Sequence, residues 1–134
     1  GWNDGSGHFR VDSLPFRAQL APMYGLFAAE MDGRRGAEIL LGGNLEAVKP
    51  QAGPYEASHG VALRAGSSRT YLDMPTRESG FTVPGEIRAI RSLAYDGNVF
   101  VLVARNYRRL KVFRVNEKYA SKQDRYAENL EGRR

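Results

Sequence analysis

The sequence predicts an all-β fold built from short antiparallel strands. Three observations predict it: short apolar runs that alternate with polar residues, turn-forming residues between the runs, and a high content of turn formers, with 15 Gly and 6 Pro in 134 residues. Alternating runs of this length are typical of half-buried strands, and so many turn formers favour short strands over long helices. The eight predicted strands are 8–11, 24–29, 37–41, 61–64, 69–74, 86–94, 99–104 and 110–115.

Glycine, proline, asparagine and aspartate separate these strands. A turn at Asn3–Gly7 precedes the first strand, and Asp32–Gly36 separates the second from the third. Leu45–Ser58 and Pro75–Gly85 are predicted as loops, and the former is the best place for a specific function, because loops on a rigid scaffold carry binding surfaces. Asp96-Gly97 predicts a tight hairpin, because this pair tolerates the positive φ of primed turns.

Two segments depart from the alternating pattern. The strand Val99–Ala104 is so apolar that we expect both of its faces to be covered. Residues 116–134 are nearly half charged and contain no β-branched run, with Tyr119, Tyr126 and Leu130 near helical spacing. We therefore divide the chain into a strand domain, 1–115, and a charged C-terminal tail, 116–134, for which a docked helix and a frayed end are the alternatives.

Composition excludes several classes of protein. The chain is 42% hydrophobic and 26% charged, as expected of a globular domain. Its net charge of +5 comes from arginines scattered among acidic neighbours, without a Lys/Arg block, so no nucleic-acid partner is predicted. No apolar stretch of about 18 residues exists, so no membrane span is predicted. The absence of cysteine excludes disulfides, thiolate zinc sites and cysteine nucleophiles.

The segment Tyr24–Asn44, YGLFAAEMDGRRGAEILLGGN, resembles a blade of the FG-GAP/VCBS family of β-propellers. The series LPFRAQLAP, LLGGN, PYEASHG, SGFTVPGEIRAI and LVARN is similar to the closing blades of bacterial propellers found beside ASPIC/UnbV modules, and the similarity covers residues 3–115. That family forms propellers in integrin α subunits and in exported bacterial proteins. The resemblance implies a partial propeller and a secreted, periplasmic or cell-surface location.

The strand count agrees with about two propeller blades, because each blade has four antiparallel strands. The second to fifth strands make one blade, and the sixth to eighth make three of the four strands of another. The first strand is a candidate for the missing fourth strand of that second blade. Two blades cannot close a ring, so exposed faces and unpaired edges favour association with other copies or a companion chain. A compact two-sheet sandwich is the alternative. The predicted interface residues are Phe9, Val11, Leu110, Val112, Tyr119 and Tyr126.

The resemblance also implies a calcium loop, with Glu30, Asp32 and Glu38 at ligand positions. Calcium takes six to eight oxygen ligands, which such a loop supplies within one turn. Arg34 occupies another ligand position and offers no side-chain oxygen, so the sequence predicts a degenerate calcium site. The alternative is that Arg34 or Arg35 forms an ion pair with these carboxylates in place of the metal.

No constellation of catalytic residues is apparent, and the sequence predicts a protein that is not an enzyme. His8 and His59 lie in no metalloprotease pattern, and Ser58 would point away from His59 on an extended chain. The predicted function is a non-enzymatic extracellular module for protein interaction or self-assembly. The alternative is a carbohydrate-binding propeller segment in which aromatic residues of the loops stack on sugar rings; these are Tyr24, Tyr55, Phe81, Tyr95 and Tyr107.

Overall fold

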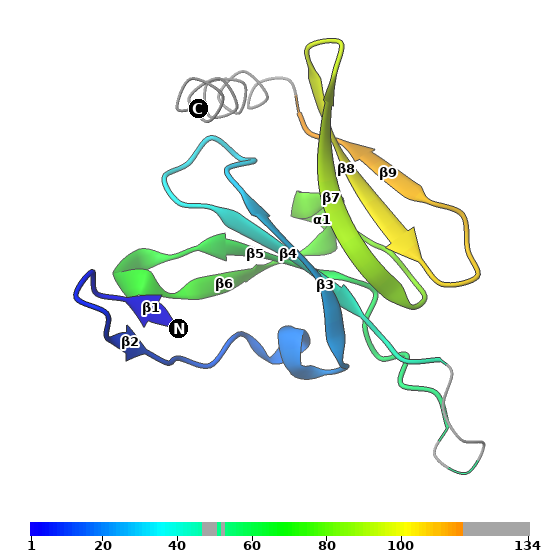
Figure 1. The fold of residues 1–134 in the computed structure, drawn as a ribbon, viewed down its shortest axis with the longest axis horizontal. Coiled ribbons are helices and arrows are strands. Elements are labelled where there is room, and N and C mark those ends of the chain that lie inside the picture. The colour runs from blue at the N-terminus through cyan, green and yellow to red at the C-terminus, as the bar shows by residue number, and fades with distance from the viewer. Residues whose placement is uncertain (47–50, 52, 117–134) are drawn as a thin grey trace.

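Three antiparallel sheets make up the fold (Figure 1). A computed structural model describes residues 1–46, 51 and 53–116, so the tail from 117 onward, with Tyr119, Tyr126 and Leu130, lies outside the described residues. The described chain is mostly β, as predicted, in sheets of two, four and three strands. Short helical turns connect the strands; they are η1 (Phe16–Gln19), η2 (Ser67–Arg69) and α1 (Thr76–Ser79).

The four-stranded sheet has the order β3-β4-β5-β6, in which each strand pairs with the next in sequence. Its strands are β3 (Met23–Ala29), β4 (Glu38–Gly43), β5 (Val61–Ala65) and β6 (Tyr71–Met74). The prediction that the second to fifth strands form one four-stranded unit is confirmed. β6 begins later than predicted because the preceding residues form η2, in which Arg69 has a φ of 59°.

The three-stranded sheet contains β7 (Ile87–Tyr95), β8 (Asn98–Arg105) and β9 (Lys111–Arg114), again in sequence order. Asp96 and Gly97 join β7 to β8 with φ angles of 49° and 68°. Positive φ at both central residues is what a primed hairpin turn requires, so the predicted turn is confirmed. The two larger sheets therefore follow the predicted strand order, while a closed propeller is not part of the described structure.

The two larger sheets pack together through β3 and β4 on one side and β7 on the other. A Cβ atom on Gly42 would lie 2.3 Å from Cδ1 of Ile87, and one on Gly25 would lie 3.0 Å from Cγ1 of Ile90. Glycine is therefore needed where the isoleucine side chains of β7 pack directly on the backbone of β3 and β4. The buried core between the sheets contains Leu40, Ala62, Met74, Phe81, Val83, Ile87, Ile90, Val101 and Val103.

The N-terminal residues cover the opposite face of the four-stranded sheet. Ala18 of η1 is buried in a second apolar cluster with residues of β4 and β5. Arg17 forms an ion pair with Asp73 of β6 at 3.1 Å, and the ring of Trp2 stacks on that of Tyr71 with centroids 5.5 Å apart. Figure 1 shows this segment lying along the four-stranded sheet, away from β7–β9.

The predicted first strand, 8–11, is shorter than expected and has a different partner. β2 (Phe9–Arg10) pairs with β1 (Trp2–Asn3), which the sequence did not predict. Side chains of Asn3 and Asp4 accept hydrogen bonds from the backbone of the intervening turn at 2.8 Å, which closes the hairpin. β2 and β9 lie on opposite sides of the molecule in Figure 1. The expectation that this strand completes the three-stranded sheet within one chain is therefore wrong.

Candidate functional site

The loop between β3 and β4 is organised around the carboxylate of Glu38. This side chain, at the start of β4, is only 3% exposed. Its Oε2 atom accepts hydrogen bonds from the backbone N–H of Met31 at 2.5 Å and of Asp32 at 3.2 Å. Burial and then the nearby negative charge of Asp32 raise the pKa of Glu38, while these N–H donors act in the opposite direction.

Asp32 is held within the same loop. Its Oδ1 accepts a hydrogen bond from the backbone N–H of Arg34 at 2.8 Å, and its Oδ2 lies 3.7 Å from Nε of Arg34. An arginine thus pairs with one of the predicted ligand carboxylates, as the alternative interpretation held. Because Arg34 is largely exposed, this ion pair stabilises the loop only modestly.

The structure gives the predicted calcium site no support. Within the described residues, no three His, Cys, Asp or Glu side chains are grouped so that they could hold a metal ion, and this includes Glu30, Asp32 and Glu38. Glu38 is directed at backbone N–H groups, and Arg34 brings a positive charge beside Asp32. The donors present therefore do not match the oxygen-rich shell that calcium prefers.

A cavity of about 400 Å³ lies beside this loop, between the two larger sheets. Its apolar walls belong to β4, β5, β6, β8, β9 and the segment after α1, and they include Leu40, Ala62, Met74, Phe81, Val101 and Phe113. The charged residues that line it are Asp32, Glu38, Arg77, Glu78 and Arg114. A cavity of this volume, lined by both apolar and charged residues, is large enough to hold a small molecule.

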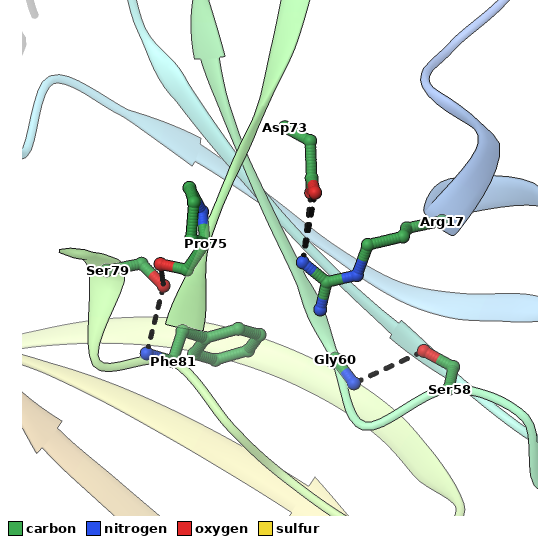
Figure 2. Close-up of polar contacts among 7 residues, drawn as sticks. All are labelled: Arg17, Ser58, Gly60, Asp73, Pro75, Ser79 and Phe81. Atoms are coloured by element: carbon green, nitrogen blue, oxygen red, sulfur yellow. Dashed lines mark hydrogen bonds and ion pairs between the residues drawn. The ribbon is translucent and has the colours of Figure 1, made fainter. Parts of the chain in front are cut away.

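The turn of helix α1 fixes one wall of the cavity, within the predicted loop Pro75–Gly85 (Figure 2). The hydroxyl of Ser79 donates to the carbonyl of Pro75 at 3.3 Å and accepts from the backbone N–H of Phe81 at 3.2 Å. The Phe81 ring packs 5.3 Å from that of Phe113 and close to Gly60, where a Cβ would lie 2.8 Å from the ring. The wall is therefore firmly positioned.

Asn44 joins three segments at the end of β4. Its side-chain Nδ2 donates to the carbonyls of Ser58 at 2.6 Å and Gly85 at 3.1 Å, and its Oδ1 accepts from the N–H of Ser58 at 3.0 Å. The residue is buried and has a φ of 77°. The long loop and the connector before β7 are thus bonded to the four-stranded sheet by one amide, which the sequence pattern did not reveal.

A buried carboxylate lies in the same region. Glu86 is fully buried and accepts hydrogen bonds from Nδ2 of Asn106 at 3.0 Å and from the backbone N–H of Glu46 at 3.2 Å. It also pairs with Arg88, whose guanidinium lies 4.4 Å from the centre of the Tyr24 ring. These partners satisfy the carboxylate, so its role is to connect β7, the β8–β9 turn and the start of the long loop.

The predicted interface residues that the structure describes are all exposed, namely Phe9, Val11, Leu110 and Val112. They do not form one patch, because Phe9 and Val11 belong to the N-terminal segment and lie far from β9 (Figure 1). Val112 instead belongs to the outer face of the three-stranded sheet, on which the register also places Arg91 and Arg114. The sequence missed that this face also includes Leu93, Phe100 and Leu102, which the strand register places beside Val112.

The aromatic residues considered for sugar binding do not form one platform. Phe81 is buried in the core. Tyr95 ends β7 beside the β7–β8 turn, and Tyr107 belongs to the β8–β9 turn. The length of β8, about 25 Å at 3.3 Å per residue, therefore separates them. Tyr24 is half exposed but carries Arg88 over its ring.

The exposed N-terminal turn holds a serine, a histidine and an aspartate in contact. Oγ of Ser6 lies 3.0 Å from Nδ1 of His8, and Oδ2 of Asp4 lies 3.4 Å from the same nitrogen. Hydrogen bonds from the side chain and backbone of Ser6 lower the pKa of Asp4. A proton relay needs the serine and the aspartate at different ring nitrogens, so this arrangement is a turn and does not match a catalytic triad.

Comparison with known proteins finds no match to any protein-family model, curated protein or solved structure. Within the described ranges, no helix has the length and apolar character needed to cross a membrane.

Proposed function

We propose that the chain is a non-enzymatic module that associates with further β-sheet units outside the cytoplasm, supplied by other copies of the chain or by a companion chain. The outer face of the three-stranded sheet carries this proposal. The extracellular location rests on the resemblance to exported propellers.

That face carries apolar side chains from all three strands, and the register also places Arg91 opposite Leu102 and Arg114 opposite Phe100 on it. Leu93 lies opposite Phe100, and Leu102 lies opposite Val112, so these four side chains share one face. Leu93 is 48% exposed and Val112 is 51% exposed, while the opposite face of β8 is buried in the core through Val101 and Val103. Exposed apolar side chains gathered on one face mark an interaction site. Only one face of β8 is buried within the described chain, so the expected cover of its other face would have to come from a partner.

A second apolar surface belongs to the four-stranded sheet. Leu26 of β3 lies opposite Leu41 of β4, on the face that the N-terminal residues cover. This cover leaves Leu26 60% exposed. The two open surfaces belong to different sheets and face away from their common core, so they can meet only between molecules. Contacts between unlike surfaces give rings or filaments.

The edge of β9 adds a smaller contribution. Among the described strands, β9 pairs only with β8, and its other edge presents backbone donors and acceptors. Such an edge accepts another strand. Because β9 has only four residues, the apolar face provides more of the contact area than the edge.

Light scattering on the full chain tests the proposal over a range of concentrations. We expect the mass of the wild type to exceed that of a monomer and to rise with concentration, and Val112→Glu to shift it to the monomer. Tyr107→Asn is the matched control, because it also removes an apolar side chain, 95% exposed, but at a turn whose φ of 51° suits asparagine.

A monomeric wild type at every concentration would refute self-association, and equal masses of Val112→Glu and wild type would refute the assigned face. Repeating the measurement with a chelator separates assembly from calcium binding. We expect the mass to be unchanged, since the loop donors do not match a calcium shell.

A further inference from the structure

The cavity between the sheets has the volume and the walls of a binding site, independently of the assembly surface. At about 400 Å³ it falls within the range of small-molecule pockets. The four residues Leu40, Ala62, Phe81 and Val101 give it an apolar interior. An occupant must therefore carry an apolar body.

The charges at the cavity wall differ in how they are compensated. Glu78 pairs with Arg64, and Asp32 pairs with Arg34. Arg77 and Arg114 are the cations of the lining, and Arg114 has an interaction of its own.

Glu38 is the exception among these carboxylates. In the part of the chain that the structure describes, its bonded partners are the neutral N–H groups of Met31 and Asp32, and no cation lies within ion-pair distance. It is also the most deeply buried of the acidic residues that line the cavity, at 3% exposure. A buried carboxylate without a counter-charge is costly, and a cation that reaches it compensates that cost.

We propose that this cavity binds a small primary amine on an apolar stem, with its ammonium group at the carboxylate of Glu38 and its stem along Leu40, Ala62 and Phe81. The ammonium group offers three donors to the carboxylate. An anionic head group placed at Glu38 would bring a second negative charge against this buried carboxylate. A neutral head group would leave the carboxylate uncompensated.

Titration of the full chain with n-hexylamine, followed by amide chemical shifts in NMR spectra, tests the proposal. n-Hexanoate and n-hexanol, which have the same stem, serve as probes of the head group. We expect saturable shifts with n-hexylamine centred on Glu38, Leu40 and Phe81, and affinity at least tenfold weaker for n-hexanoate.

Two variants assign the head group. Glu38→Gln keeps an oxygen for the loop N–H groups and is expected to bind n-hexylamine no more tightly than n-hexanol. Glu78→Gln is the matched control, because this residue also lines the cavity but is paired with Arg64, and we expect its affinity to stay within twofold of the wild type.

Three results would overturn the proposal. These are the absence of saturable binding of n-hexylamine, equal affinity for n-hexanoate, or unchanged binding in Glu38→Gln when that variant gives a folded spectrum. The mass of the assembly is a separate readout, so this proposal can fail while the proposed function holds.

Discussion

Replacement of Asn44 tests how the long loop and the second sheet are held to the first. The side chain makes three hydrogen bonds to the backbone of Ser58 and Gly85. Asn44→Gly removes these bonds and leaves the backbone free to keep its φ of 77°. Asn44→Ala removes the same bonds and adds the cost of a Cβ in the left-handed region.

The magnitudes follow from these two effects. Three hydrogen bonds at about 1 kcal/mol each give a loss of about 3 kcal/mol in the free energy of unfolding for Asn44→Gly. A left-handed conformation costs an ordinary residue about 1–2 kcal/mol, so Asn44→Ala is expected to lose about 4–5 kcal/mol. The difference between the two variants measures the backbone effect, and Asn44→Gly compared with the wild type measures the hydrogen bonds.

Urea unfolding followed by far-ultraviolet circular dichroism supplies both differences. Ordinary surface substitutions change the free energy of unfolding by up to about 0.5 kcal/mol. If Asn44→Gly changed it by no more than that, the amide would not be joining the segments as described. If alanine and glycine were equally destabilising, the left-handed backbone would not be a constraint at this position.

Three further substitutions probe other parts of the fold. Gly42→Ala places a methyl group against Ile87 and should lower the free energy of unfolding by about 1–3 kcal/mol in the same urea assay; an unchanged midpoint would refute the close approach. Arg17→Ala removes a partly exposed ion pair with Asp73 and should cost less than about 1 kcal/mol, so a larger loss would mean that the pair anchors the N-terminal segment. The raised pKa of Glu38 means that the folded state holds this proton more tightly than the unfolded state does. Protonation of Glu38 therefore stabilises the folded state fully at a pH below 4.5, the ordinary pKa, and this stabilisation is lost as the pH rises through the raised pKa. In Glu38→Gln, melting temperatures measured across this pH range should no longer show that loss. A pH profile identical to that of the wild type would contradict the assignment.

The strands and their order could be predicted from the sequence because the evidence for them is local. Alternation and turn chemistry defined β3 to β9, and Asp96-Gly97 formed the expected hairpin. Each of these features depends on neighbouring residues only, so pattern reasoning was sufficient.

The site could not be predicted in the same way because it depends on contacts between distant segments. The walls of the cavity come from residues as far apart in sequence as Leu40 and Phe113. Asn44 bonds to the carbonyl of Gly85, and nothing near Asn44 in the sequence indicates this contact. The pairing of β2 with β1 was missed because β1 has only two residues.

The loop before β4 shows a different limit. The resemblance placed Glu38 and Asp32 at ligand positions, but it could not show which atoms these carboxylates contact. In the structure Glu38 turns toward the backbone of its own loop. These hydrogen bonds join the start of β4 to the loop backbone at Met31 and Asp32.

The close approach of β4 and β7 also couples the sequence choices available to the two sheets. Because no space remains between residue 42 and the side chain of Ile87, the volume at the two positions is shared between the strands. An atom gained on one strand must be lost on the other, since cores tolerate substitutions best when total volume is conserved. A larger residue at position 42 is therefore expected to require a smaller one at position 87, although the two positions lie far apart in the chain.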